Sequence, residues 1–374
     1  MRRTAGSIRT ALVAVSLTLG ASPLGAQSVV ADTTPPREPR GRDRSTSLRI
    51  LPVIGSAPET GFVGGATALR VSSPVGETVT RPSTDQIYAA YTAKQQFRAF
   101  VSTDRWSREN RWGVTAQLEY QRFPQPFFGI GIDAPEAGEE WYESRSLIAS
   151  ATVRRKLARA LYAQVGYRYT NTTVRDAEEG GAIEAGELLG TNGGVVSQAI
   201  GGAAWDSRDN LFAPEAGAFV QATAAYSGRA VGADYQFGHY IADARRYMRL
   251  GRGVLAGQAY IEATSGQAPF DQLSLLGSGT IMRGYARGRY RDRELAAAQI
   301  EYRLPVFGRL GVAAFAGAGT VAPTLSKLSS SDVLPSFGAG ARWLLLPKQR
   351  TTIRVDYGMG KSSSGLYIAF NEAY

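Results

Sequence analysis

From residue 47 onward, hydrophobic and polar residues alternate with a period of two, in segments of about ten residues. Glycine, proline, aspartate, asparagine and arginine separate these segments, and helical spacing is nearly absent. Between residues 255 and 263, one side of the expected strand is small and apolar and the other polar: Leu255, Gly257, Ala259, Ile261 and Ala263 against Gln258, Tyr260 and Glu262. The pattern predicts an all-β protein of many antiparallel strands.

The composition of the two faces distinguishes a membrane barrel from a soluble sandwich. The polar face carries charges in mid-strand, as at Glu301 and Asp356, whereas the other face is aliphatic with tyrosine or tryptophan near strand ends. A dry protein core would have to pair every one of those charges. An outer-membrane barrel instead encloses them in a polar interior and turns its aliphatic face to lipid. We therefore expect a transmembrane antiparallel β-barrel.

About 14 strands are clear from the alternation, and we expect about 16 in all, because single-chain bacterial barrels have an even number. Residues 85–105 fit either one long strand or two, and residues 48–55 fit either a strand or a lead-in. Short connections alternate with long ones: 156–160, 249–253, 305–309 and 347–350 against 173–194, 266–293 and 322–334. Since such barrels have short periplasmic turns and long outer loops, the long connections are predicted to be extracellular.

The N-terminal residues predict export. Three arginines (Arg2, Arg3 and Arg9) precede an apolar stretch over residues 11–19, and small residues follow at 25–26. This order is typical of a removable secretory signal, and the apolar stretch is too short to span a membrane. We assign residues 1–26 to a signal peptide, residues 27–46 to a disordered periplasmic linker rich in proline and arginine, and residues 47–374 to the barrel.

Composition narrows the chemistry further. The chain has no cysteine, which excludes disulfides, thiol nucleophiles and cysteine-based metal sites, and it has a single histidine. That residue, His239, lies near Asp243, but no G-x-S-x-G motif accompanies it, so we expect neither an enzyme nor a cofactor. The formal net charge is +10, and losing the three arginines of the signal leaves +7. On an exported protein this favours outer-membrane lipid and lipopolysaccharide as partners over nucleic acid.

Four segments, in this order along the chain, resemble the BamA/TamA outer-membrane assembly-factor superfamily, also called the bacterial surface antigen barrel. They are Pro58–Gly61, Phe127–Gly131, a turn containing Asp206, Arg208, Asp209, Pro214 and Gly217, and the segment 276–285 ending in Arg283-Gly284-Tyr285. The resemblance implies that the turn is periplasmic and that the Arg-Gly-Tyr loop folds back into the lumen. Gly365, Ile368 and Phe370 also match the barrel-targeting signal of such proteins.

The resemblance implies a role in assembling or translocating outer-membrane proteins, with client proteins or the barrel assembly machinery as partners and the bacterial outer membrane as location. A passive pore, or a structural surface antigen with a plugging loop, is the alternative. Two departures stand out. The linker 27–46 leaves no room for a periplasmic POTRA repeat, and the segment 315–319 (FAGAG) lacks the aspartate of the family's Phe-x-Asp-x-Gly strand.

Arg283 needs a carboxylate partner if it lies in the lumen, because a buried unpaired guanidinium loses the hydrogen bonds it makes in water. Alternation turns three acids inward: Glu301, the first choice because it follows the loop directly, and also Glu262 and Asp356. Gly284 would allow a sharp reversal, and Tyr285 would lie against Gly317 and Gly319. The other inward arginines (Arg245, Arg303, Arg342 and Arg354) form either an anion-preferring lumen or, as we favour, pairs with Asp243, Glu301 and Asp356.

Overall fold

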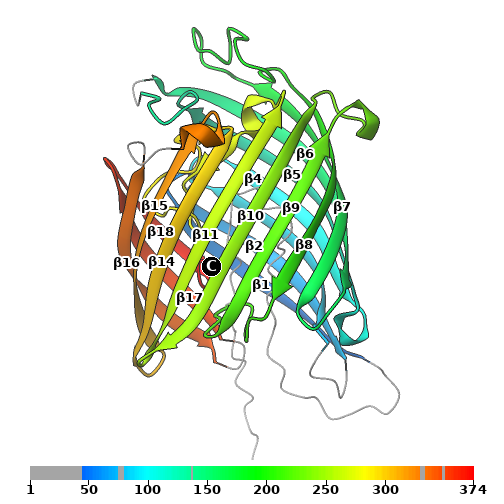
Figure 1. The fold of residues 1–374 in the computed structure, drawn as a ribbon, viewed down its shortest axis with the longest axis vertical. Helices are drawn as coiled ribbons and strands as arrows, with labels where there is room; N and C mark the ends of the chain where they lie inside the picture. The colour runs from blue at the N-terminus through cyan, green and yellow to red at the C-terminus, as the bar shows by residue number, and fades with distance from the viewer. Residues whose placement is uncertain (1–43, 75–79, 136–137, 329–332, 348–349) are drawn as a thin grey trace, which may run out of the picture.

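The computed structural model describes residues 44–374 except 75–79, 136–137, 329–332 and 348–349. Sixteen antiparallel strands form a closed barrel in which chain neighbours pair, and β1 and β18 close the ring (Figure 1). The expected fold and strand number are confirmed. The signal peptide and nearly all of the predicted linker lie outside the described residues.

Every barrel strand except β18, which has eight residues, is as long as the roughly 9–11 residues that a tilted strand needs to cross a bilayer, or longer. The barrel strands are β1 (Arg44–Ala57), β2 (Gly61–Pro74), β3 (Ser83–Thr92), β4 (Phe97–Trp106), β5 (Trp112–Phe127), β6 (Glu140–Lys156), β7 (Leu161–Arg175), β8 (Gly193–Asp206), β9 (Gly217–Ser227), β10 (Phe237–Leu250), β11 (Gly253–Gly266), β14 (Glu294–Phe307), β15 (Leu310–Ala322), β16 (Leu334–Leu346), β17 (Thr351–Gly360) and β18 (Ser363–Phe370). Two three-residue strands, β12 (Ser274–Leu276) and β13 (Tyr290–Asp292), are not part of the barrel wall and pair with each other as a separate small sheet.

The two uncertain regions are now assigned. Residues 48–55 lie within β1, so the barrel begins at Arg44, three residues before the predicted start. Residues 85–105 form two strands, β3 and β4, because a tight turn interrupts them: Gln95 has φ 61° and its amide donates to Thr92 O at 3.0 Å. The alternation alone could not show this turn, because it contains neither glycine nor proline.

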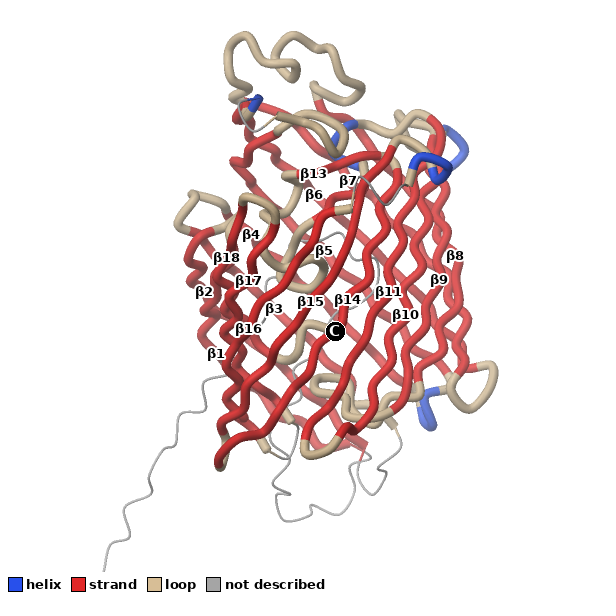
Figure 2. Tube along the Cα trace, turned by 60° about the vertical axis from the view of Figure 1, so that its left-hand side comes forward, coloured by secondary structure: helices blue, strands red, loops and turns tan. Residues whose placement is uncertain are grey.

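The side chains sort as the alternation predicts. Along β11, Gln258 is 5% exposed and faces the lumen, whereas Ile261 is 47% exposed and faces outward. The outer surface carries large exposed hydrophobic residues such as Ile87 and Val165, and acyl chains would cover them. Within the described residues, no helix has the length and apolarity needed to cross a bilayer. The connections named as short and as long lie at opposite ends of the barrel, as predicted, and Figure 2 shows most of the loop mass at one end. From β6 onward, the alternation in length fails at two places: the β8–β9 connection (207–216) is longer than the β9–β10 connection (228–236), and the β17–β18 connection is only 361–362.

Candidate functional site

The loop between β11 and β14 folds into the barrel. Its tip, residues 277–289, joins β12 to β13. Leu276 at the end of β12 and Met282 and Tyr285 of the tip are fully buried against Leu295 of β14 and Val321 of β15. The loop therefore carries its own apolar anchor, which packs on the inner wall of the barrel.

Gly284 brings the loop tip against β17 and β18. Its φ is +113°, and a Cβ there would lie 2.6 Å from the backbone carbon of Met359, so both conformation and space require glycine. Its amide donates to Tyr367 Oη at 2.9 Å, and its carbonyl accepts from Ser363 Oγ at 2.7 Å. The Arg-Gly-Tyr tip is thus attached from inside to the last strand of the barrel.

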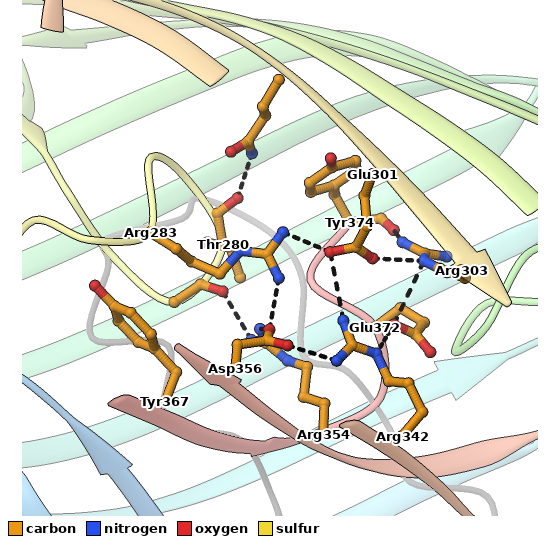
Figure 3. Close-up of polar contacts among 12 residues, drawn as sticks. Thr280, Arg283, Glu301, Arg303, Arg342, Arg354, Asp356, Tyr367, Glu372 and Tyr374 are labelled. Carbon is orange, nitrogen blue, oxygen red and sulfur yellow. Dashed lines mark hydrogen bonds and ion pairs between the residues drawn. The ribbon is translucent and has the colours of Figure 1, made fainter. Parts of the chain in front are cut away.

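Arg283 lies between two of its three predicted partners, Glu301 on β14 and Asp356 on β17, whose side chains point into the lumen. Its Nη1 donates to Asp356 Oδ2 at 2.5 Å and its Nη2 donates to Glu301 Oε2 (Figure 3). The guanidinium also lies over the ring of Phe315 on β15, with its carbon 3.5 Å from the ring centroid. All three ionic side chains have 0% exposure, so the charges are compensated by one another and not by water.

The ion pairs continue toward the periplasmic end. Arg303 Nε donates to Glu301 Oε1 at 2.6 Å, and Arg342 Nη1 pairs with Asp356 Oδ1. Arg354 binds Asp356 Oδ2 at 2.8 Å and the loop carbonyl of Gly279 at 2.8 Å. We call these ion-paired residues the lumenal charge network: Arg283, Glu301, Arg303, Arg342, Arg354, Asp356 and Glu372. The inward arginines are paired, as favoured from the sequence, and Arg245 likewise pairs with Asp243 at 2.5 Å.

The prediction that Glu262 could pair with Arg283 is wrong. Its Oε1 lies 2.8 Å from His239 Nε2, and its Oε2 accepts from Tyr260 Oη at 2.7 Å. The strand register explains why: Ala256, not Glu262, is the β11 residue opposite Glu301. Six residues of strand therefore separate the two acids, or roughly 20 Å.

The prediction that Tyr285 lies against Gly317 and Gly319 is also wrong. Gly317 and Gly319 make room for Met282, whose Sδ and Cγ would lie 3.3 and 3.2 Å from a Cβ at those positions. Tyr285 instead lies over Gly360, where a Cβ would come within 2.3 Å of the ring. Its hydroxyl donates to Pro335 O at 2.6 Å and accepts from the Lys361 amide at 2.7 Å.

The predicted turn motif connects β8 to β9 at the end opposite the long loops. Asp206 accepts from Arg208 at 2.9 Å and from Arg81 at 3.1 Å. Gly217 has φ +99° and Pro214 is buried. The turn also reaches the β16–β17 turn, because Arg350 Nη1 donates to Asp209 Oδ2 at 2.6 Å.

Asp209 titrates below the ordinary range for aspartate. Burial raises its pKa, but the hydrogen bond from Arg350 and those from the Glu215 and Ala216 amides outweigh burial and leave the pKa lowered. The carboxylate is therefore held charged by contacts that exist only in the folded state.

The targeting-signal residues lie in β18 at the seam with β1. Ile368 forms the one residue pair between the two strands, with Ser56, whereas β1 pairs with β2 along its whole length from Arg44 to Ala57. Gly365 lies close to the β1–β2 turn, since a Cβ there would meet Pro58 Cγ at 2.4 Å, and Phe370 is buried. The strand pair that closes the barrel therefore has fewer paired residues than any other in the ring.

Sequence reasoning missed the segment after β18. Residues 371–374 turn into the lumen and are buried, and the C-terminus lies within the barrel outline in both views of the whole fold (Figures 1 and 2). Glu372 accepts from Arg342 Nε at 2.8 Å and lies 3.4 Å from Arg303 Nε (Figure 3). The only signal in the sequence was an acid just beyond the targeting motif.

In the described part of the chain, no cluster of three or more possible metal ligands occurs.

Comparisons with known proteins agree with this geometry. Residues 78–362 match the family model described as Omp85 superfamily domain. A search of curated proteins found no match. Among solved structures, the chain is similar to BamA from Haemophilus ducreyi lacking POTRA domains 1–3, with a TM-score of 0.61 and 14% identity over 88% of this chain and 70% of that one. It is also similar to CdiB from Acinetobacter baumannii, with a TM-score of 0.56 and 12% identity over 88% of this chain.

The matches fix the family and the fold. This chain spans 65% of the CdiB chain, just under two thirds of its length. The described residues form the barrel with its loops and turns and include no POTRA-like domain. The family match covers well over half of the sequence and includes the Arg-Gly-Tyr loop and the Asp206–Gly217 turn. The chain therefore belongs to the Omp85 superfamily and is a bacterial outer-membrane β-barrel.

Proposed function

We propose that this barrel assembles or translocates outer-membrane proteins, and that its β1 edge at the seam accepts a strand of the client. The observation that carries the proposal is the single β1–β18 residue pair, against 14 between β1 and β2. An unpaired strand edge is a template for another strand, which gains main-chain hydrogen bonds on pairing. In hydrocarbon the gain is larger, because each unsatisfied backbone group costs several kcal/mol there.

The outer surface near the seam supports a client that arrives within the membrane. Leu48 and Ile50 on β1 are 70% and 76% exposed and face outward. A transmembrane strand laid beside β1 would continue this apolar surface. Clients of this kind are amphipathic strands with one aliphatic face, the same pattern that builds this barrel. Outer-membrane lipid and lipopolysaccharide would cover the remaining exterior, and the role needs no catalytic chemistry.

Site-specific photo-crosslinking tests the proposal. A photoreactive amino acid at Ile50 or Ile54 should crosslink to other outer-membrane proteins in living cells. The same probe at Ile87 on β3, which is 62% exposed but lies on a strand paired on both edges, is the matched control. Equal capture at Ile87 and β1, or capture of lipopolysaccharide alone at β1, would contradict an assembly role and favour a passive pore or structural surface protein.

A further inference from the structure

Arg246 is an arginine on the lipid-facing side of a membrane-spanning strand. It alternates outward with Met248 and Leu250, which are 43% and 51% exposed, and it lies four residues before the end of β10. Its side chain is exposed and forms no hydrogen bond or ion pair with any described residue. Four residues are roughly 13 Å of strand, or about 10 Å of depth at the usual tilt. A charge at this depth is unfavourable in hydrocarbon unless an anion compensates it.

The neighbours of Arg246 leave space beside it on the outer surface. Its paired residues are Ala218 on β9 and Gly257 on β11, and these three strands lie side by side on the wall nearest the viewer in Figure 1. A Cβ at Gly257 would lie 3.9 Å from Gln299 O, so no side chain fills this position. The guanidinium is therefore free to extend along the surface toward the periplasmic edge, as long basic side chains do at membrane interfaces.

Two neighbouring periplasmic hairpins repeat one three-residue pattern at this edge. Each has an exposed apolar residue, a glycine and an arginine: Leu250-Gly251-Arg252 between β10 and β11, and Phe307-Gly308-Arg309 between β14 and β15. The glycines have φ of 58° and 56°, which lets each hairpin turn within two residues. The side chains of Arg252 and Arg309 are exposed and, like that of Arg246, bind no described residue. Because β11 pairs with β14, the two hairpins are adjacent.

A register shift turns Phe307 to the lipid side of the barrel. Strict alternation would point it inward, with Glu301 and Arg303, but the irregularity between Pro305 and Phe307 pairs it with the outward residue Leu310. Phe307 and Leu310 are 81% and 56% exposed, and both extend the lipid-facing surface. Apolar side chains beside free arginines fit a membrane interface, because the apolar groups enter the acyl region while the guanidinium groups bind phosphate. A protein partner in the periplasm would leave these outward apolar side chains unused.

The two ends of the barrel differ in charge. The long β7–β8 connection (176–192) at the outer end carries five acids and no base. At the periplasmic end, the acids of the β8–β9 turn are already paired, Asp209 with Arg350 and Glu215 with Arg249. They do not neutralise the three free arginines. The uncompensated positive charge therefore lies at the level of the inner leaflet, and lipopolysaccharide at the opposite end is out of its reach.

We propose that Arg246, Arg252 and Arg309 form a binding site for anionic phospholipid of the inner leaflet. The guanidinium groups hold the headgroup phosphate, since their paired N–H donors match two phosphate oxygens. The acyl chains lie against the exposed apolar residues of the two hairpins. Phosphatidylglycerol binds more tightly than a zwitterionic phospholipid, because the positive group of a zwitterionic headgroup is repelled by the arginines. The site does not rest on the proposed assembly function.

Native mass spectrometry of the detergent-solubilised barrel measures the preference directly. The protein is titrated with phosphatidylglycerol or with phosphatidylcholine of the same acyl chains, and lipid-bound barrel is counted. We expect the native barrel to bind phosphatidylglycerol at least fivefold more tightly. Arg246→Gln, Arg252→Gln and Arg309→Gln together should bring the ratio close to one, whereas lysine at the same three positions, which keeps the charge, should preserve most of the preference.

The matched control changes the same number of charges at the outer end. Arg175→Gln, Arg229→Gln and Lys361→Gln replace three exposed basic residues and should leave the ratio unchanged. Heat-modifiability on gels shows which variants are folded. If the periplasmic triple variant does not fold, Arg252→Gln with Arg309→Gln, both at exposed hairpin tips, provides the same comparison. A ratio that survives in the folded periplasmic variant, or that falls equally in the control, would overturn the site.

A photoreactive amino acid at Phe307 distinguishes lipid from protein in living cells. With phosphate-labelled phospholipid, we expect a labelled barrel of nearly unchanged mass, and less label when Arg252 and Arg309 are replaced by glutamine. A discrete protein adduct that disappears in the same glutamine variant would overturn the proposal, because the arginines would then serve an acidic protein partner.

Discussion

Removing Asp356 should destabilise the barrel more than removing Arg283, although the two form one ion pair. Asp356 contacts three guanidinium groups, those of Arg283, Arg342 and Arg354, and has 0% exposure. Asp356→Asn leaves four arginines with two carboxylates, whereas Arg283→Met leaves three arginines with three. The charge balance of the network therefore worsens in the first variant and improves in the second.

The magnitudes follow from this count. Breaking a buried pair by removing one partner costs about 3–5 kcal/mol, chiefly because an uncompensated charge is left behind. Asp356→Asn should approach about 5 kcal/mol. Arg283→Met strands no charge, since Glu301 keeps Arg303 and Arg342, and its cost should be nearer about 2 kcal/mol, the scale of the lost contact with the Phe315 ring.

Urea unfolding in detergent micelles, followed by heat-modifiability on gels, measures both variants and the double variant. Because the residues share one network, we expect non-additivity of about 0.5–3 kcal/mol in the double-mutant cycle. A larger loss for Arg283→Met than for Asp356→Asn would refute the charge-balance reasoning. Unchanged heat-modifiability and protease resistance in Arg283→Met would show that the pair does not hold the loop at all.

Two further predictions concern the loop tip and the periplasmic turn. Gly284→Ala should expel the tip from the inner wall and expose residues 277–289 to protease, whereas Gly201→Ala, where a Cβ meets nothing within 4 Å, should not. Asp209→Asn should lower stability at neutral pH. Since the folded pKa of Asp209 is lowered, its contribution is full above its unfolded pKa of about 3.9 and is lost as pH falls through the folded value. The difference between variant and native melting temperatures should therefore shrink below about pH 4, and a constant difference would contradict the assignment.

The sequence predicts which face a residue occupies more reliably than its height along the barrel. Alternation placed Glu301, Asp356 and Glu262 inward, and all three do point into the lumen or its polar clusters. Only the register, which depends on every turn before it, separates Glu262 from Glu301 by six residues of strand. Period-two patterning carries no information on that offset.

Contacts made by irregular segments were the least predictable. The loop motif identified Arg283 and Gly284, but nothing in it shows that Met282, and not Tyr285, takes the space left by Gly317 and Gly319. Glu372 lies beyond the last alternating segment, and its inward turn depends on one left-handed residue, Asn371. Such contacts arise from how the chain folds back in three dimensions, and a local pattern does not encode them.

The two strands at the seam are held very differently, and this asymmetry bears on how the barrel would open. From inside the lumen, β18 is bound through Tyr367 and Ser363 to the loop tip, and through Glu372 to the charge network. By contrast, the strand pairs of the described residues join β1 to β2 along its whole length and to β18 at Ser56. Opening the seam by moving β18 would disrupt buried ion pairs and loop contacts, whereas moving β1 away from β18 while β1, β2 and β3 stay paired to one another would break a single residue pair. A client strand should therefore add to β1 while β18 stays fixed, and crosslinks from β18 positions such as Leu366 should be much weaker than those from Ile50.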